Sequence, residues 1–347
     1  MAACDAIRSS APGRCGIVGN PTDMYGGSVL SCSIPRRASV ALSESDALIL
    51  QTRGQTCALR GPTDFHMRGD RFDVPRAVLS HLRLYDLKVR LTYDSDIPYQ
   101  GGLSGSTALV AAVLWAVLRY SRLTYHRHYF AELTRYVELN RMGIVCGYQD
   151  AYMVTFGGLN YMEFRDKEFY RTVADEPYAT VESLTDRVPA IPLVVAHTGR
   201  QHNSGAVHRP LRERWLEGEA AVVDGYQRIG KLAREGKRAF LDGDWERLGR
   251  LMTENHAIQR DLGGSGPENE RLITAALDAG AIAAKLAGAG SGGTIIALHT
   301  DPRSLEEPLR RAGAVDLLYP TPVAGVRDEL EDEAAAEDPG PSACRDS

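Results

Sequence analysis

The sequence has little that would tie the protein to a membrane or to nucleic acid. No apolar run reaches about 18 residues, the length that a transmembrane helix needs. The N-terminus lacks the charged and then apolar layout of a secretory signal peptide. The formal net charge is -5, which gives no general attraction to nucleic acid or to an anionic membrane surface. We therefore expect a cytoplasmic protein with neither kind of partner.

The cysteines form no pattern typical of a zinc site or a disulfide framework. There is no Cys-x-x-Cys pair, and no histidine stands at zinc-site spacing. We interpret them as reduced thiols, most of them in the core or incidental: Cys4, Cys15, Cys32, Cys57, Cys146 and Cys344. The sequence also shows no internal repeat. Its 347 residues are 44% hydrophobic and 24% charged, an ordinary globular composition that is long enough for two lobes.

What is present is a glycine-rich stretch, residues 98–107, between a predicted strand and a predicted helix. Before it, apolar and polar residues alternate over residues 87–94, the period-two pattern of a half-buried strand. After it, residues 108–118 are rich in helix formers and apolar on most sides, which predicts a buried helix. A strand, a glycine-rich turn and a buried helix are the layout of a phosphate site.

The composition of this turn suits a phosphate. A helix N-terminus leaves backbone N–H groups unpaired and carries partial positive charge. Glycines let a phosphate approach that backbone, and hydroxyls can bind phosphate oxygens or a magnesium ion. The residues concerned are Gly101, Gly102, Ser104, Gly105, Ser106 and Thr107. The alternative is a tight turn before a core helix. A Walker P-loop is excluded, because no Gly-Lys-Ser/Thr closes the stretch.

The stretch resembles the second motif of the GHMP small-molecule kinases, the superfamily of galactokinase and of homoserine, mevalonate and phosphomevalonate kinases. Pro98, Gly102 and Leu103 match its pattern of a proline, three residues and then Gly-Leu. The resemblance implies that residues 101–107, Leu103 included, bind the phosphates of ATP. By register, Ser106 lies where the family has its magnesium-binding serine.

An earlier segment, residues 11–27, predicts a turn at Pro12-Gly13, a short strand and a polar loop bounded by glycines. The loop side chains Asn20, Thr22 and Asp23 suit recognition of hydroxyl groups, and a decorated surface loop is the alternative.

This segment resembles the first motif of the sugar kinases in the same superfamily, with Asn20-Pro21 in place of Glu-His. The form Gly-Asn-Pro-Ser/Thr-Asp is similar to that of glucuronokinases. The resemblance implies that Arg14 lies beside the transferred phosphate and that Asp23 binds the sugar.

Two carboxylates follow the buried helix. Residues 129–141 have helical spacing, and Glu138 lies near the end, where a lone glutamate is normally solvated. It precedes Asp150 by 12 residues, about the offset between the magnesium glutamate and the catalytic aspartate of several GHMP kinases. Residues 147–164 resemble both glucuronokinases and heptose-phosphate kinases. The resemblance implies Glu138 as a magnesium ligand, Asp150 as the base or orienter of the acceptor hydroxyl, and Gln149 as a substrate contact. The alternative for Asp150 is a helix cap.

A basic cluster follows a buried strand predicted at residues 191–196. It consists of Arg200, His202, His208 and Arg209. It would grip a carboxylate or phosphate on the sugar, or it is solvated surface. The segment from Ser204 to Gly218 is similar to plant-type glucuronokinases, with Ala206 in place of their lysine.

A second glycine loop, residues 288–293, is predicted to join an alanine-rich helix containing Lys285 to a β-branched strand. A Rossmann loop is excluded on this expectation, because it runs from strand to helix. The loop resembles the third GHMP motif, Lys-x-x-Gly-Ala-Gly-x-Gly-Gly, which implies that Gly290 and Ser291 approach the substrate.

The three motifs, in family order, imply the GHMP kinase fold. This is an α+β chain of two lobes, a ribosomal-protein-S5-like ATP-binding lobe followed by a ferredoxin-like α/β lobe. We expect the N-terminal domain at residues 11–170 and the C-terminal domain at residues 185–326, with a linker rich in charge and proline at residues 165–190. Residues 1–10 are expected to be a loose leader, and residues 327–347 a disordered acidic tail.

The implied reaction is transfer of the γ-phosphoryl group of ATP to a sugar hydroxyl, with ATP and Mg2+ as cofactors. The favoured acceptor is the anomeric hydroxyl of a sugar acid such as glucuronate, for nucleotide-sugar synthesis. The alternatives are a heptose- or octose-phosphate kinase that makes a sugar bisphosphate, and a non-catalytic sugar sensor with the same fold. The expected partner is a small-molecule sugar or sugar phosphate, and monomer and homodimer both stay open.

Overall fold

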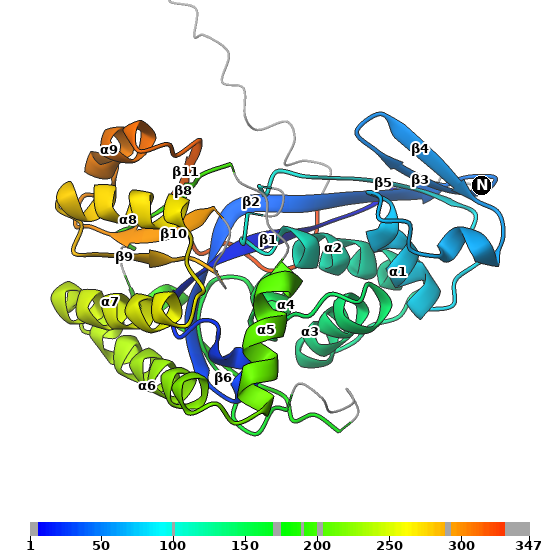
Figure 1. Ribbon diagram of the computed structural model, residues 1–347. Helices are drawn as coiled ribbons and strands as arrows, with labels where there is room; N and C mark the ends of the chain where they lie inside the picture. The colour runs from blue at the N-terminus through cyan, green and yellow to red at the C-terminus, as the bar shows by residue number, and fades with distance from the viewer. Residues whose placement is uncertain are drawn as a thin grey trace, which may run out of the picture.

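The computed structural model describes residues 6–98, 101–168, 175–188, 191–199, 204–288 and 293–329, with the backbone alone for residues 204–209. The chain folds into an α+β molecule around two sheets (Figure 1). Among the described helices, none is both long and apolar enough to cross a membrane. The described cysteines Cys15, Cys32, Cys57 and Cys146 are free thiols.

The larger sheet has its strands in the order β12-β1-β2-β5-β3-β4, and β6 pairs with β2 and β7 with β6. All of these pairs are antiparallel except β3 with β5. The bounds are β1 Ile7–Val18, β2 Ser28–Glu44, β3 Leu48–Thr52, β4 Gln55–Leu59, β5 Val89–Ser95, β6 Leu159–Glu163, β7 Thr180–Ser183 and β12 Arg327–Asp328. The strand predicted just before the glycine-rich stretch is confirmed as β5.

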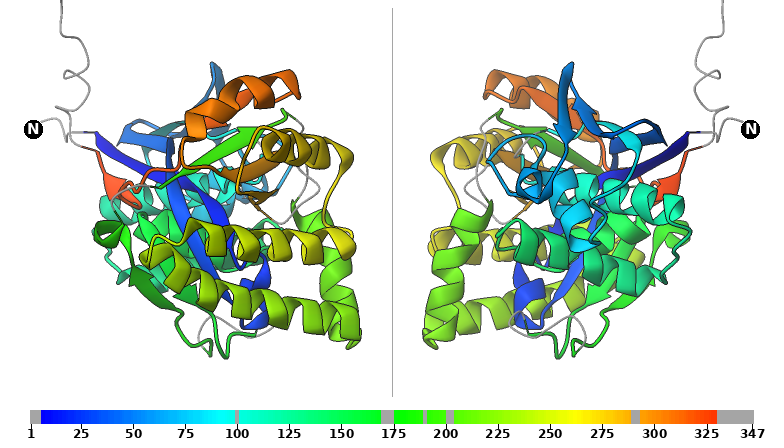
Figure 2. Two further views of the ribbon diagram at one scale, coloured as in Figure 1. Left: turned by 90° about the vertical axis from the view of Figure 1, so that its left-hand side faces the viewer. Right: turned by 90° about the vertical axis from the view of Figure 1, so that its right-hand side faces the viewer.

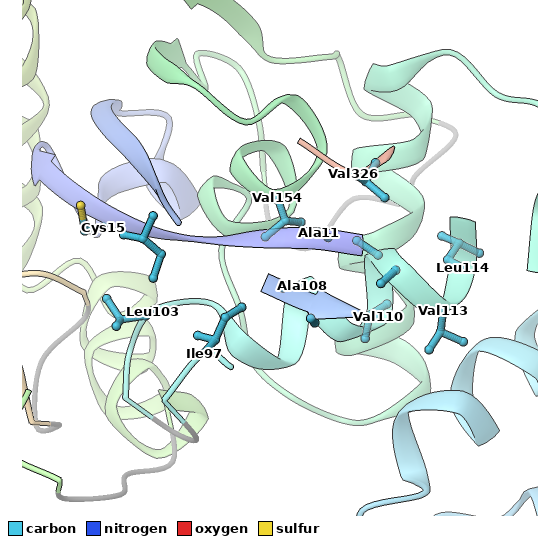
Figure 3. Close-up of a cluster of buried hydrophobic side chains, with 14 of the residues drawn as sticks. Ala11, Cys15, Ile97, Leu103, Ala108, Val110, Val113, Leu114, Val154 and Val326 are labelled. Carbon is cyan, nitrogen blue, oxygen red and sulfur yellow. The ribbon is translucent and has the colours of Figure 1, made fainter. Parts of the chain in front are cut away.

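Helix α2 (Gly105–Tyr120) packs on this sheet against β1 and β2, and α1 (Asp73–His81), α3 (Arg127–Tyr136) and α4 (Gln149–Phe156) pack around it. Figure 3 shows this core where Ala11 of β1, Val110 of α2 and Val154 of α4 come together. Because α2 has neighbours on several sides, it is apolar on most of its surface, and the predicted buried helix is confirmed.

The second sheet is antiparallel, in the order β11-β8-β10-β9. Helices α8 and α9 lie on one side of it and α7 on the other (Figure 1). Helix α7 also contacts β1, and its neighbour α6 packs on β2, so this helical pair joins the two sheets. The bounds are β8 Leu193–His197, β9 Ala283–Leu286, β10 Thr294–Leu298, β11 Asp316–Leu318, α5 Ser204–Leu216, α6 Ala220–Leu241, α7 Trp245–Asp261, α8 Pro267–Asp278 and α9 Glu306–Arg311.

Short helical turns complete the described secondary structure. They are η1 Thr22–Tyr25, η2 Pro62–Phe65, η3 Val137–Arg141, η4 Thr185–Arg187 and η5 Pro302–Leu305. Turn η3 is π-helical and directly continues α3.

The expected leader and tail are wrong at their inner ends. Residues 7–10 already belong to β1, where Ser9 and Ser10 pair with Asp328 and Arg327 of β12. Figure 2 shows the red β12 beside the dark blue start of β1. The hydroxyl of Ser9 donates to the carbonyl of Ala112 at 2.8 Å, so a polar segment that looked loose in sequence is held by backbone pairing and by α2.

The predicted turn at Pro12-Gly13 is also wrong, since β1 runs through it with an irregularity in register between Pro12 and Arg14. Proline lacks an N–H and is tolerated where a strand is irregular. Gly13 is needed there for a different reason. A Cβ atom on it would lie 2.7 Å from the carbonyl oxygen of Leu103 in the glycine-rich stretch.

Two further expectations fail because local propensity loses to sheet pairing. The alanine-rich stretch with Lys285 is strand β9 and not a helix, so the second glycine loop joins two strands, which still excludes a Rossmann turn. The charged linker also contains β7, which pairs with β6 of the larger sheet.

Candidate active site

The three segments that resemble family motifs meet at one place. The backbone N–H of Arg14 donates to the carbonyl of Leu103 at 3.1 Å, and its Nη1 donates to the carbonyl of Gly102 at 2.7 Å. Gly288, at the start of the third motif, lies against the same peptide, because a Cβ atom on it would be 2.9 Å from the Gly102 oxygen. Glycine is required there by this close backbone approach.

Arg14 also binds Asp150. Its Nε donates to Oδ1 of Asp150 at 2.7 Å, and its Nη2 donates to the same oxygen. The side chain of Asp150 is 27% exposed and that of Arg14 is 8% exposed, so the carboxylate lies on the open side of the pair. Among the described residues Oδ2 of Asp150 accepts no hydrogen bond. The pair can therefore hold one carboxylate oxygen fixed and present the other to a ligand.

The alternative that Asp150 caps its own helix is wrong. The amides of Tyr148 and Gln149, at the start of α4, donate instead to Oδ2 of Asp23 at 2.6 and 2.8 Å. A Cβ atom on Gly147 would lie 1.9 Å from that oxygen, so glycine is needed for Asp23 to reach them. Asp23, from the first-motif loop, thus fixes the start of the helix that carries Asp150.

Glu138 lies in the π-helical turn η3, a type of irregularity often found at functional sites. Its Oε2 accepts a hydrogen bond from Oγ1 of Thr107 at 2.7 Å, and the residue is 2% exposed. Burial raises the pKa of Glu138 to about 7, hydrogen bonds from Thr107 and Ser106 oppose the shift, and the charge of Asp150 adds to it. Glu138 and Ser106 thus lie together at the start of α2, near Asp150.

This donor set fits Mg2+, which takes one or two protein oxygen ligands and completes its shell with water and phosphate oxygens. In the part of the chain that the structure describes, no group of three or more His, Cys, Asp or Glu side chains could hold a metal. A magnesium ion here would therefore depend on Glu138, a hydroxyl and the phosphates of a nucleotide.

The N-terminus of α2 fits a phosphate. Ser104 caps it in the left-handed conformation, with φ 64°, and Gly102 has φ 75°. The hydroxyl of Ser104 is buried and has no hydrogen-bond partner among the described residues, and buried polar atoms rarely stay unpaired. The loop is held from the other lobe, because Oγ1 of Thr294 donates to the carbonyl of Gly101. Thr294, which follows the third motif, was not predicted from the sequence, because a single threonine at the start of a strand carries no signal of its own.

Two predicted substrate contacts are already engaged within the protein. The hydroxyl of Thr22 donates to the carbonyl of Gly19 at 2.7 Å, and Thr22 is 0% exposed. Gln149 is 3% exposed and donates from Nε2 to Oγ of Ser31 at 3.1 Å. These contacts assign both side chains to shaping the loop and the start of α4, and their direct contact with substrate stays a prediction.

The predicted substrate contacts from residue 200 onward are only partly described. Arg200, His202, Gly290 and Ser291 lie outside the described residues, as do the side chains of His208 and Arg209. Helix α5, which carries Arg209, is nevertheless located by Trp215, whose ring centroid is 5.1 Å from that of Tyr25 in η1. Helix α5 therefore packs beside the first-motif loop.

Comparisons with known proteins agree with this geometry. The GHMP kinases N terminal domain matches residues 73–158, the GHMP kinases C terminal domain matches residues 237–315, and the galactokinase galactose-binding signature matches residues 3–44. Glucuronokinase 1 of Arabidopsis thaliana is 30% identical over 337 residues, which cover 89% of this chain and 90% of the relative.

Two further proteins are more distant. The D-glycero-alpha-D-manno-heptose 7-phosphate kinase of Campylobacter jejuni is 26% identical, over 83% of this chain and 87% of the relative. The crystal structure of Lactococcus lactis galactokinase with galactose superposes with a TM-score of 0.76 at 17% identity, over 94% of this chain and 95% of that chain. With its motifs, its fold and a relative at 30% identity in agreement, the chain belongs to the GHMP kinase family.

Proposed function

We propose that the protein is a sugar kinase that transfers the γ-phosphoryl group of ATP to the anomeric hydroxyl of a sugar acid such as glucuronate. The observation that carries the catalytic part is the Arg14–Asp150 pair, with Oδ2 of Asp150 free of hydrogen bonds from described residues. The similarity to Arabidopsis glucuronokinase 1 supports the choice of acceptor.

Each residue of the site has a role in this proposal. Bound ATP with Mg2+ would supply the phosphoryl group and the metal's charge. The amides at the start of α2 and the Ser104 hydroxyl would hold phosphate oxygens, and Glu138 with Ser106 would hold the metal. Asp150 would accept or orient the proton of the acceptor hydroxyl. Arg14 would keep that carboxylate in position and offset the negative charge that develops on the phosphoryl group.

A second candidate is phosphorylation of a sugar that already carries a phosphate. It is supported by the similarity to the Campylobacter heptose 7-phosphate kinase. Both acceptors are anionic and differ in the position and charge of the anion. A sensor without activity is disfavoured, because the carboxylates Asp150 and Glu138 and the buried Arg14 all lie at the site.

The test is a coupled assay of ADP release with Mg-ATP over a panel of free sugars, uronic acids and sugar phosphates. We expect glucuronate to give the highest kcat/KM. A higher kcat/KM for a heptose phosphate would replace the first candidate by the second. Absence of ADP release with every member of the panel would overturn both.

A further inference from the structure

Lys285 of β9 is a fully buried lysine with no carboxylate partner among the described residues. It is 0% exposed, and its Nζ donates to Oδ1 of Asn20 at 2.9 Å and to the carbonyl of Leu286 at 2.5 Å. Asn20 lies in the loop between β1 and η1, which belongs to the other sheet. The contact therefore joins the two lobes.

The other end of the Asn20 amide is also bound. Its Nδ2 donates to the carbonyl of Gly288 at 2.8 Å, and the residue is 2% exposed. The Asn20 amide has one orientation, because its oxygen accepts from Lys285 and its nitrogen donates to Gly288. It therefore connects strand β9 of the second lobe to the glycine loop that follows this strand. This accounts for an asparagine at a position that the sequence had suggested for substrate contact.

The backbone beside Asn20 is held by the same lobe. Oδ1 of Asn255 in α7 accepts a hydrogen bond from the N–H of Gly19 at 2.9 Å, and its Nδ2 donates to the carbonyl of Asn20 at 3.2 Å. The loop then continues to Asp23, which fixes the N-terminus of α4 and with it Asp150. Hydrogen bonds joined by two short stretches of backbone thus lead from Lys285 to the start of the helix that carries Asp150.

We propose that Lys285 is a positioning residue that, through Asn20, fixes the acceptor side of the active site against the glycine loop. This inference rests on the proposed kinase function for its kinetic readout, although the link itself is a matter of geometry. Lys285 would touch neither acceptor nor nucleotide, and it would act through the loop that carries Asp23.

The electrostatic surroundings agree with a lysine held for its hydrogen bonds and not for its charge. The pKa of Lys285 is lowered from 10.5 to about 7; complete burial is the main cause, Cys15 opposes the shift, and the positive charge of Arg14 contributes to it. Arg14 and Cys15 face it from β1, and His256 faces it from α7. A neutral amine has two N–H donors, which match the two acceptors, Asn20 and Leu286.

The first test is Lys285→Met, which keeps an unbranched side chain and removes both donors. Leaving the Asn20 oxygen buried and unpaired should release the loop, so the KM for the acceptor should rise about tenfold or more. The KM for ATP should stay within about twofold, because the phosphate loop is held separately by Arg14 and Thr294. The matched control is Lys231→Met on the exposed side of α6, which should change neither constant.

The second test is Asn20→Asp, which pairs the buried lysine with a carboxylate. An opposite charge in contact favours the protonated form, so the pKa of Lys285 should rise by one unit or more from about 7. It can be followed by NMR titration of protein with 13C-labelled lysine, with Lys285→Met used to assign the signal. The profile of kcat/KM for the acceptor against pH should contain an ionisation near 7 in the wild type, shifted upward by a similar amount in the variant.

These outcomes separate the link from the proposed function. The assay uses whichever acceptor the panel selects, and the titration needs no turnover, so failure of glucuronate leaves the inference testable. An acceptor KM unchanged in Lys285→Met, or a loss shared equally with the KM for ATP, would overturn the positioning role. A Lys285 pKa that does not move in Asn20→Asp would show that the two side chains are not in contact.

Discussion

Two buried lysines, one in each lobe, differ in the groups that they contact. Lys167, in the first lobe, contacts Glu132 at 2.7 Å and Glu176 at 3.3 Å, and all three side chains are at most 1% exposed. Lys285, in the second lobe, is equally buried and contacts an amide oxygen and a backbone carbonyl. The first is an ion cluster and the second is a hydrogen-bonded link.

The surroundings of each lysine match its role. The Lys167 cluster lies against α4, because its ammonium stands 4.2 Å from the ring centroid of Tyr148, and the Tyr152 hydroxyl donates to Glu132. The Lys167 cluster therefore supports the helix that carries Asp150. Lys285 instead contacts Asn20, in the loop that leads to Asp23 at the start of that helix. In this comparison the carboxylate-paired lysine stabilises one lobe, whereas the lysine without a carboxylate partner among the described residues links the two lobes beside the proposed active site.

The largest effect should come from breaking the ion cluster. Lys167→Met leaves Glu132 and Glu176 buried without their cation, which should cost about 3–5 kcal/mol of unfolding free energy. Urea unfolding would measure it, with Lys231→Met as the exposed control. A loss below that of Lys285→Met would reverse the comparison.

The Arg14–Asp150 pair, to which we assign the catalytic role, is intermediate between the two lysines, because Arg14 is paired with a carboxylate that stays partly exposed. Asp150→Asn keeps the shape of the side chain and removes its charge and proton acceptor. We expect kcat to fall by about 100-fold or more, with ATP still bound. Steady-state kinetics and nucleotide binding would measure this, and near-normal turnover would remove Asp150 from its proposed role.

The sequence predicts those features of the site whose residues are close together in the chain, and it does not predict contacts between distant residues. The glycine-rich turn and α2 were predicted, because their glycines, hydroxyls and apolar run are contiguous in the chain. The pairing of Asp23 with the start of α4 was not, since it joins residues 125 positions apart and shows only in the fold. Lys285 was assigned to a helix, because alanine-rich composition hides a strand that pairs with β10.

The free energy of unfolding should depend on pH through Lys285. The pKa of Lys285 is about 7 in the folded protein and ordinarily near 10.5, so between these values the unfolded chain binds more protons. Stability of the wild type relative to Lys285→Met should therefore rise with pH in this range, by at most about 1.4 kcal/mol per unit. Urea unfolding at pH 7.5 and 8.5 would show it, and a pH-independent difference would mean that the buried lysine is charged throughout.

A smaller effect is expected at the proposed magnesium site. Glu138→Gln and Ser106→Ala should each raise the magnesium concentration for half-maximal activity, by roughly tenfold for the glutamate. A magnesium titration at saturating ATP measures it. If Glu138→Gln leaves the titration unchanged, the carboxylate serves only Thr107 and the local fold.

The central claim is that Asp150 and Arg14 direct phosphoryl transfer to an anomeric hydroxyl. It is tested most directly by 31P NMR of the product made from glucuronate, ATP and Mg2+. The account predicts a new phosphate ester signal coupled to the anomeric proton, formed by the wild type and at least about 100-fold more slowly by Asp150→Asn. A phosphate ester at another hydroxyl, or equal rates in the two proteins, would contradict it.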